Sequence, residues 1–121
     1  MPFLMTHLHV AKSMYQRIPE AIKDLSQFLL GNIAPDAVHN RMGYTSEHKR
    51  VSHLCAGNER WGMVTNNDEW AESVLKFLRK NKNSDNYSFI LGYSCHILTD
   101  IFNNIAVWTP FRLEYPNELI K

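Results

Sequence analysis

Two residues with metal-ligand chemistry lie four positions apart in the most apolar stretch of the chain, residues 89–107. His96 and Asp100 have the spacing that stacks two side chains on one face of a helix. An imidazole nitrogen and a carboxylate oxygen at this separation can chelate one divalent cation, most commonly zinc. A buried hydrogen-bonded His–Asp pair fits the same spacing, since a buried carboxylate needs some partner. The spacing alone favours neither interpretation.

Other candidate ligands are scattered through the first half of the sequence. His7 follows Thr6 near the N-terminus, Asp36 follows Pro35, and His53 follows Ser52. Each is weak evidence by itself, because isolated histidines are common on helices and an aspartate after proline is usually a turn residue. A common site for them would require the fold to bring distant segments together.

The hydrophobic pattern predicts an all-α fold of about four to five helices around a buried central helix that carries His96 and Asp100. Strand-like alternation is scarce, and helical periodicity is clear in several segments. The expected helices cover about residues 6–17, 19–30, 67–80 and 85–106. Two long connections, 32–54 and 55–66, have little periodicity, and no terminal element is expected after Pro110.

The composition predicts one domain, residues 1–121, with a net charge of +1. This balance gives no nucleic-acid-binding patch. His96, Asp100 and the other polar residues of 89–107 exclude a transmembrane segment there. Without a recognisable signal peptide, and with two cysteines, a cytoplasmic location is expected. The oligomeric state is not indicated.

Together, and in this order, four short motifs resemble the zinc-dependent phospholipase C family, an all-helical family related in fold to zinc-type single-strand nucleases. The resemblance covers roughly residues 1–105, and the last motif, Gly-x-x-x-His-x-x-x-Asp, is the most specific. The motifs are Thr6-His7, the Gly-x-x-x-Pro-Asp of Gly31 to Asp36, Ser52-His53, and Gly92 to Asp100.

The resemblance implies a set of zinc ligands. One zinc would take Asp36, His53, His96 and Asp100, and Asp100 would bridge to another zinc that also takes His7 and the N-terminal amine. The amine is a departure, because this chain begins with Met1 and not with the processed tryptophan of secreted members.

A second departure lies downstream, where the family's remaining zinc needs further histidines. No histidine follows His96, so a third site is not supported. Either one metal site has been lost or the 121 residues are an N-terminal part of a longer polypeptide, and the untidy C-terminus favours the latter. His9 is expected in the second shell or at the surface. Asn103 and Asn104 are expected to orient ligands or phosphate through their amides.

The resemblance implies a metal-dependent phosphoesterase, or phospholipase C-like hydrolase. Zinc would lower the pKa of a coordinated water, and the resulting hydroxide would attack phosphorus. Asp36 would be a ligand or the general base, and the substrate a small phosphodiester or a phospholipid head group. Because one metal's ligands are absent, this chain is expected to be poorly active or inactive. The alternative is a non-catalytic helical protein with a structural metal or a buried His–Asp network.

Overall fold

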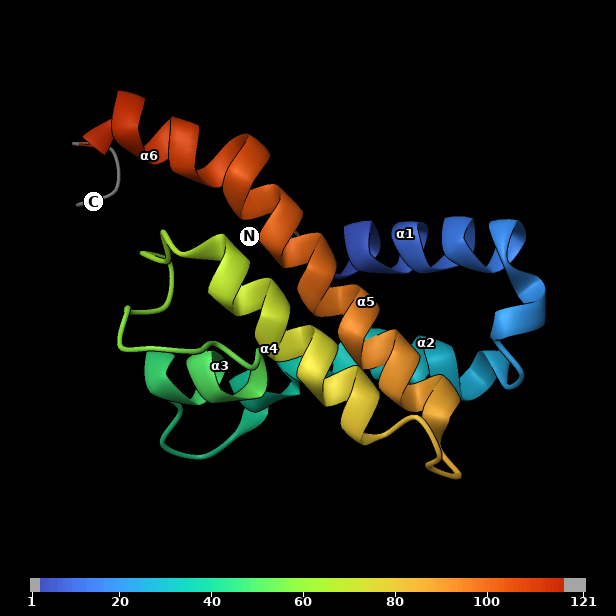
Figure 1. The fold of residues 1–121 in the computed structure, drawn as a ribbon. Coiled ribbons are helices and arrows are strands. Elements are labelled where there is room, and N and C mark those ends of the chain that lie inside the picture. Colours follow the sequence, from blue (N-terminus) through green and yellow to red (C-terminus); the bar gives the residue numbers. More distant parts are fainter. Residues whose placement is uncertain (1–2, 117–121) are drawn as a thin grey trace.

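The computed structural model describes residues 3–116, and every regular element in that range is helical, which confirms the all-α prediction (Figure 1). None of these helices is long and apolar enough to cross a membrane. The elements are α1 (Leu4–Arg17), the 3₁₀ turn η1 (Pro19–Ala21), α2 (Leu25–Ile33), the 3₁₀ segment η2 (Ala34–Asn40), α3 (Ser46–Ser52), α4 (Asn67–Lys80), α5 (Tyr87–Asn103), the π-helical segment η3 (Asn104–Trp108) and α6 (Thr109–Glu114).

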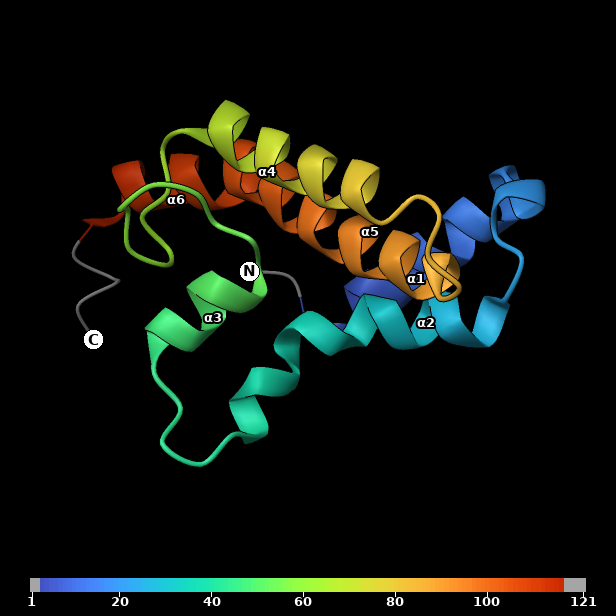
Figure 2. The ribbon, with the colours of Figure 1, turned by 60° about the horizontal axis from the view of Figure 1, so that its bottom comes forward.

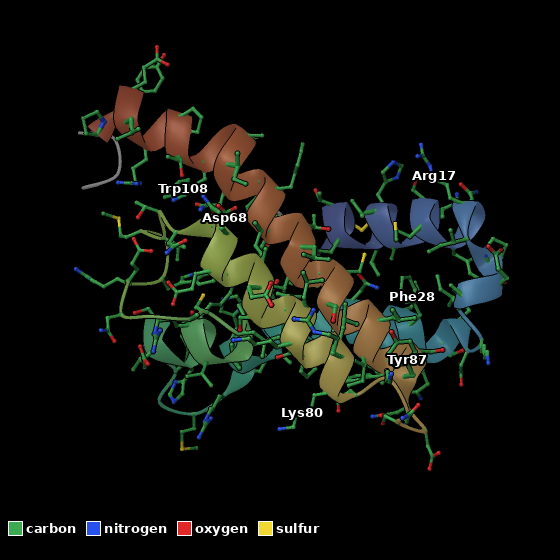
Figure 3. All side chains as sticks on the ribbon, viewed as in Figure 1. Arg17, Phe28, Asp68, Lys80, Tyr87 and Trp108 are labelled. Atoms are coloured by element: carbon green, nitrogen blue, oxygen red, sulfur yellow. The ribbon has the colours of Figure 1, made fainter. Side chains whose placement is uncertain are left out.

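Helix α5 is the centre of the domain, as its apolar sequence predicts. It packs against α1, α2 and α4, with α4 on one side and α2 on the other (Figure 2). On the α4 side, Trp70 and Val74 are buried against Ile97 and Ile101 of α5. On the other side, Phe28 of α2, labelled in Figure 3, is buried with residues of α1 and α5. A helix covered on several faces must be apolar nearly all round.

Two glycines allow α2 and α5 to cross with their backbones in close approach. A Cβ atom at Gly92 would overlap the carbonyl oxygen of Phe28, and one at Gly31 would overlap the carbonyl oxygen of Phe89. Both obstacles are backbone atoms, which cannot rotate away. The glycines of the Gly-x-x-x-Pro-Asp and Gly-x-x-x-His-x-x-x-Asp motifs are therefore the contact points of these two helices.

The helix expected over residues 19–30 is wrong in its bounds. Pro19–Ala21 forms only a 3₁₀ turn, and α2 starts after Asp24, whose side-chain Oδ1 accepts a hydrogen bond from the backbone N–H of Gln27 at 3.1 Å. This cap begins α2 as a helix separate from the 3₁₀ turn. Gly31 does not end the helix. It lies inside α2, where the close approach of the α5 backbone leaves no room for a side chain.

The segments expected to be irregular contain short helices. Residues 32–54 include η2 and α3, each seven residues long, and α6 follows η3 near the C-terminus. Helices of two turns show too few periodic positions to be recognised from the sequence. Their formation depends on packing against the rest of the domain.

Replacing Gly92 by alanine tests the helix crossing. Gly→Ala inside a helix normally stabilises a protein by up to about 1 kcal/mol, whereas here we expect destabilisation by about 2–3 kcal/mol because the methyl group meets backbone. Urea unfolding followed by circular dichroism measures the change. In the control Gly43→Ala, the new methyl meets nothing within 4 Å, and only the cost of the positive φ of 73° remains. A Gly92→Ala protein at least as stable as the parent would contradict the crossing.

Candidate metal centre

The five predicted metal ligands come from four separate elements and converge in the structure. His7 lies on α1, Asp36 on η2, His53 at the C-cap of α3, and His96 and Asp100 on α5. The three histidines and Asp100 are each at most 2% exposed, whereas the Asp36 side chain is 28% exposed. The cluster therefore opens towards solvent on the Asp36 side.

The distances between these side chains are those of atoms that share an ion. His53 Nε2 lies 3.2 Å from both Asp36 Oδ1 and Asp100 Oδ2. His96 Nε2 lies 3.3 Å from Asp100 Oδ2 and 3.6 Å from Asp36 Oδ2. Ligands about 2.0–2.1 Å from a tetrahedral zinc ion are ~3.3–3.4 Å from one another. The Nε2 atoms of His53 and His96 thus lie from these carboxylate oxygens at about the separation of two ligands of one zinc ion.

Asp100 faces both sides of the cluster with different oxygens. Its Oδ2 faces His53 and His96, and its Oδ1 lies 3.2 Å from Nε2 of His7. The His7 and His96 rings are stacked, with centroids 3.5 Å apart. Two groups of ligand atoms meet the spacing of a metal site: His7, His96 and Asp100, and Asp36, His53 and His96. The carboxylate of Asp100 is placed as a bridge would be.

Backbone carbonyls select the tautomers of two histidines. The Nδ1–H of His53 donates to the carbonyl of Lys49 at 2.9 Å, and that of His96 donates to the carbonyl of Asn32 at 2.6 Å. Each neutral ring then presents an Nε2 lone pair, the form that binds metals. Within residues 3–116, Nε2 of His7, His53 and His96 and Oδ1 of Asp100 are buried without a hydrogen-bond partner. Orphaned polar atoms that point at one place fit a bound cation.

The charges of the clustered side chains also favour a bound cation. Lone pairs that face carboxylate oxygens repel each other unless a proton or a metal ion lies between them. In the metal-free chain, burial disfavours the charged ring of His96, but the carboxylates of Asp100 and Asp36 outweigh it and raise the pKa of His96 to about 9. Burial also opposes ionisation of Asp100 and Asp36, yet the surrounding histidines hold both pKa values well below their usual range.

Hydrogen bonds from three elements hold α3 at the cluster. Ser52 Oγ donates to the carbonyl of Pro35 at 2.9 Å, which ties α3 to the residue before Asp36. Tyr93 of α5 donates its hydroxyl to the carbonyl of Ser52, and Trp70 Nε1 of α4 donates to the carbonyl of His53 at 2.8 Å. His53 is therefore buried at the meeting point of several elements, although its sequence suggests a loop.

Lys49 is a member of the cluster that the sequence analysis missed. Its Nζ lies 3.0 Å from Asp36 Oδ1 and 2.9 Å from His39 Nε2. The one sequence signal is its position four residues before His53, which places both on one face of α3. Trp61 is also close, with its ring centroid 4.5 Å from that of His53.

The remaining candidates lie outside the cluster of ligand atoms. His9 is exposed on α1, one of the two positions expected for it. Asn104 is buried, but its amide nitrogen donates to the carbonyl of Val64 at 3.0 Å and to Oδ1 of Asn67 at 2.8 Å. These bonds fasten η3 to the start of α4, and they do not support the expected ligand-orienting role. Asn103, half-buried at the end of α5, keeps that role only as a prediction.

The pH dependence of stability should differ between the metal-free and the zinc-loaded chain. With EDTA, the raised pKa of His96 contributes stability below its ordinary value of 6.5, and this is lost as the pH rises towards 9. The lowered pKa values of Asp36 and Asp100 contribute stability above about 3.8 that is lost on acidification. We expect the metal-free Tm to be highest near pH 5–6.5 and to fall from pH 7 to 9.

The stabilisation by zinc, measured as the difference in Tm with zinc and with EDTA, should grow over the same interval because the metal competes with the His96 proton. Differential scanning fluorimetry across pH 5–9 measures both trends, and His96→Gln should flatten them. A metal-free Tm that rises between pH 7 and 9 would contradict the charge assignment.

Comparison with known proteins agrees with the ligand chemistry. The family model described as "Zinc dependent phospholipase C" matches residues 6–103, most of the chain. No curated protein sequence and no solved structure matches it. The matched region contains all five clustered residues and the helices that present them. The chain therefore belongs to the zinc-dependent phospholipase C family.

Proposed function

We propose that this chain is a zinc-dependent hydrolase of phosphodiesters, with its metal centre in the cluster of His7, Asp36, His53, His96 and Asp100. The observation that carries the proposal is the convergence of three buried histidine Nε2 atoms on the carboxylates of Asp36 and Asp100. Membership in the zinc-dependent phospholipase C family supports zinc as the ion and a phosphodiester bond as the target.

In this proposal the chain holds one or two zinc ions. Asp36, His53, His96 and Asp100 would hold the first, and the 3.2–3.6 Å between the histidine Nε2 atoms and the carboxylate oxygens supports this assignment. His7 would hold a second ion, with Asp100 as the bridge through its other oxygen. The N-terminal amine that the resemblance adds lies on Met1, outside the described residues. A third zinc has no support, because no histidine follows His96.

Bound zinc would lower the pKa of a coordinated water and polarise a phosphoryl oxygen, the two contributions that metals make to phosphodiester hydrolysis. The chain's own residues would orient the metal ligands and shield them from solvent. The carbonyls of Lys49 and Asn32 keep the His53 and His96 rings in their binding tautomers. The ligand role of Asp36 is favoured over that of a general base, because its Oδ1 lies 3.2 Å from Nε2 of His53 and its Oδ2 lies 3.6 Å from Nε2 of His96.

The substrate would be a small phosphodiester or a phospholipid head group, in line with the family. It would approach on the Asp36 side, where the cluster is partly exposed. A cytoplasmic location stays a prediction, as does the assignment of residues 1–121 to the N-terminal part of a longer polypeptide.

A structural metal site in a non-catalytic protein is the second candidate, and burial of four of the five candidate ligands favours it. Coordination number separates the two candidates. Cobalt substituted for zinc should give the weak absorption of five-coordinate ions if a site is open to water. The intense bands of a four-coordinate ion that do not change on adding phosphate would instead support the structural role.

Exchanging His7 and, separately, His9 for glutamine tests the second ion, since both lie on α1. His7→Gln should bind about one zinc less per chain than the parent, because it removes a ligand that no other residue replaces. His9→Gln, which changes an exposed side chain, should bind zinc as the parent does. Elemental analysis after dialysis counts the metal. Equal zinc content in both variants would contradict the role of His7.

Asp100→Asn tests the centre as a catalyst. The parent should hydrolyse a chromogenic phosphodiester slowly and only with zinc, since the ligands of one family metal are absent. Asp100→Asn should lose this activity by at least about 100-fold, because it removes the carboxylate shared by both ions. Activity that survives EDTA, or that is equal in Asp100→Asn, would contradict the proposal, and efficient turnover by the parent would show that the missing ligands are not needed.

A further inference from the structure

The ammonium group of Lys49 is buried beside the candidate metal centre, which is an unusual position for a cation. The residue is 7% exposed, and its Nζ pairs with Asp36 Oδ1 at 3.0 Å. Lysine is rarely buried, because desolvating an ammonium costs several kcal/mol unless it is paired. A second positive charge next to a zinc site adds repulsion to that cost. Asp36 alone would then have to compensate both the ammonium and the nearby metal.

Lys49 stands on the side from which a ligand would enter. The four other members of the centre are at most 2% exposed, while the Asp36 side chain is 28% exposed and His39, the other partner of Lys49, is exposed. His39 Nε2 lies 2.9 Å from Nζ and holds the ammonium towards Asp36. Any ligand that reaches the metals from the Asp36 side would therefore pass this ammonium.

The ammonium of Lys49 also has an N–H donor without an acceptor among the described residues. Lysine has three N–H donors; His39 Nε2 and Asp36 Oδ1 face it, and within residues 3–116 no third acceptor lies at hydrogen-bond distance. The ring of Trp61, with its centroid 5.6 Å from Nζ, covers it from another direction. Aromatic cover excludes water from a cation and strengthens its attraction for an anion.

The net charge of the whole centre also favours an anionic ligand. Nζ of Lys49 and Nε2 of His53 face the same atom, Asp36 Oδ1. If Asp36 also coordinates zinc, one carboxylate faces two cations. The two carboxylates, the ammonium and one Zn²⁺ together leave a net charge of +1, and a second zinc makes it +3. An anionic ligand is the natural complement of such a site.

We propose that Lys49 is a ligand-binding residue of this centre, and that its ammonium binds an anionic phosphate oxygen of a molecule held at the metals. The inference rests on the metal centre proposed above and adds a residue to it. In the absence of ligand, the ammonium pairs with the carboxylate of Asp36, and His39 holds the ammonium in place. Lys49 supplies a fixed positive charge to the centre.

A purely structural role for Lys49 predicts different effects from this proposal. If the ammonium only holds Asp36, its removal should weaken zinc binding and phosphate binding together. If it binds the ligand, its removal leaves zinc affinity equal or higher, because a repelling charge has gone, and weakens phosphate alone. The ratio of the two affinities is therefore the informative measurement.

The experiment uses the zinc-loaded chain and two probes, inorganic phosphate and the soluble phosphodiester glycerophosphocholine, each titrated by calorimetry. Zinc affinity is measured separately by competition with a chelator. Lys49→Met should lower affinity for at least one probe by about tenfold or more, since it removes a charge-assisted hydrogen bond. The probe that loses more shows whether free phosphate or a head-group diester is preferred. Lys49→Arg should retain most of the binding.

Two further variants serve as controls. Lys80→Met removes the same charge at the exposed end of α4, labelled in Figure 3, and should leave both affinities unchanged. His39→Ala replaces an exposed partner of the ammonium, so it tests Lys49 even if Lys49→Met fails to fold. It should weaken probe binding severalfold with zinc affinity unchanged.

Unchanged probe binding in a folded Lys49→Met, or in His39→Ala when Lys49→Met fails to fold, would overturn the inference. A parallel loss of zinc binding would also overturn it, because that is the structural result. If the parent binds zinc but neither probe, the inference about Lys49 fails and the metal centre stands. If the parent binds no zinc, the proposed function itself fails.

Discussion

The contact between the backbones of α2 and α5 is the constraint on which the rest of the domain depends. Gly31 and Gly92 remove the side chains that would hold the two helices apart. Because the backbones meet, the carbonyl of Asn32 on α2 comes within hydrogen-bond distance of Nδ1 of His96 on α5. The same packing that builds the core thus orients the ring of His96, a predicted metal ligand, and a methyl group at either glycine would disturb both.

The centre is built by long-range contacts and then made rigid by short hydrogen bonds. Four elements contribute side chains, and the backbone carbonyls of Lys49 and Asn32 accept hydrogen bonds from two of the rings. A carbonyl held in a helix or at its end can move little, so ring orientation is set before any ion binds. The cost is a group of buried polar atoms that need a proton or a metal ion between them, and for that reason stability should depend on both pH and metal.

Exposure and charge vary together across the centre. His7, His96 and Asp100 lie on the enclosed side, and Asp36 lies on the side open to solvent, paired with Lys49. A buried ammonium beside the proposed zinc site would attract an anion and discriminate against further cations. The position of Lys49 gives the open side of the centre a chemistry that its metal ligands alone do not provide.

The sequence by itself determined the features that depend on local spacing. Helical periodicity places His96 and Asp100 on one face, and continuous apolarity makes 85–106 the central helix, in agreement with α5. Short motifs were enough to indicate the family. The tertiary structure alone decided the burial of His53, the contacts that turn the amide nitrogen of Asn104 away from the ligand atoms, and the place of Lys49. Each of these results from contacts between residues that are distant in sequence or lie in two-turn helices, where periodicity carries no information about which side chains will meet.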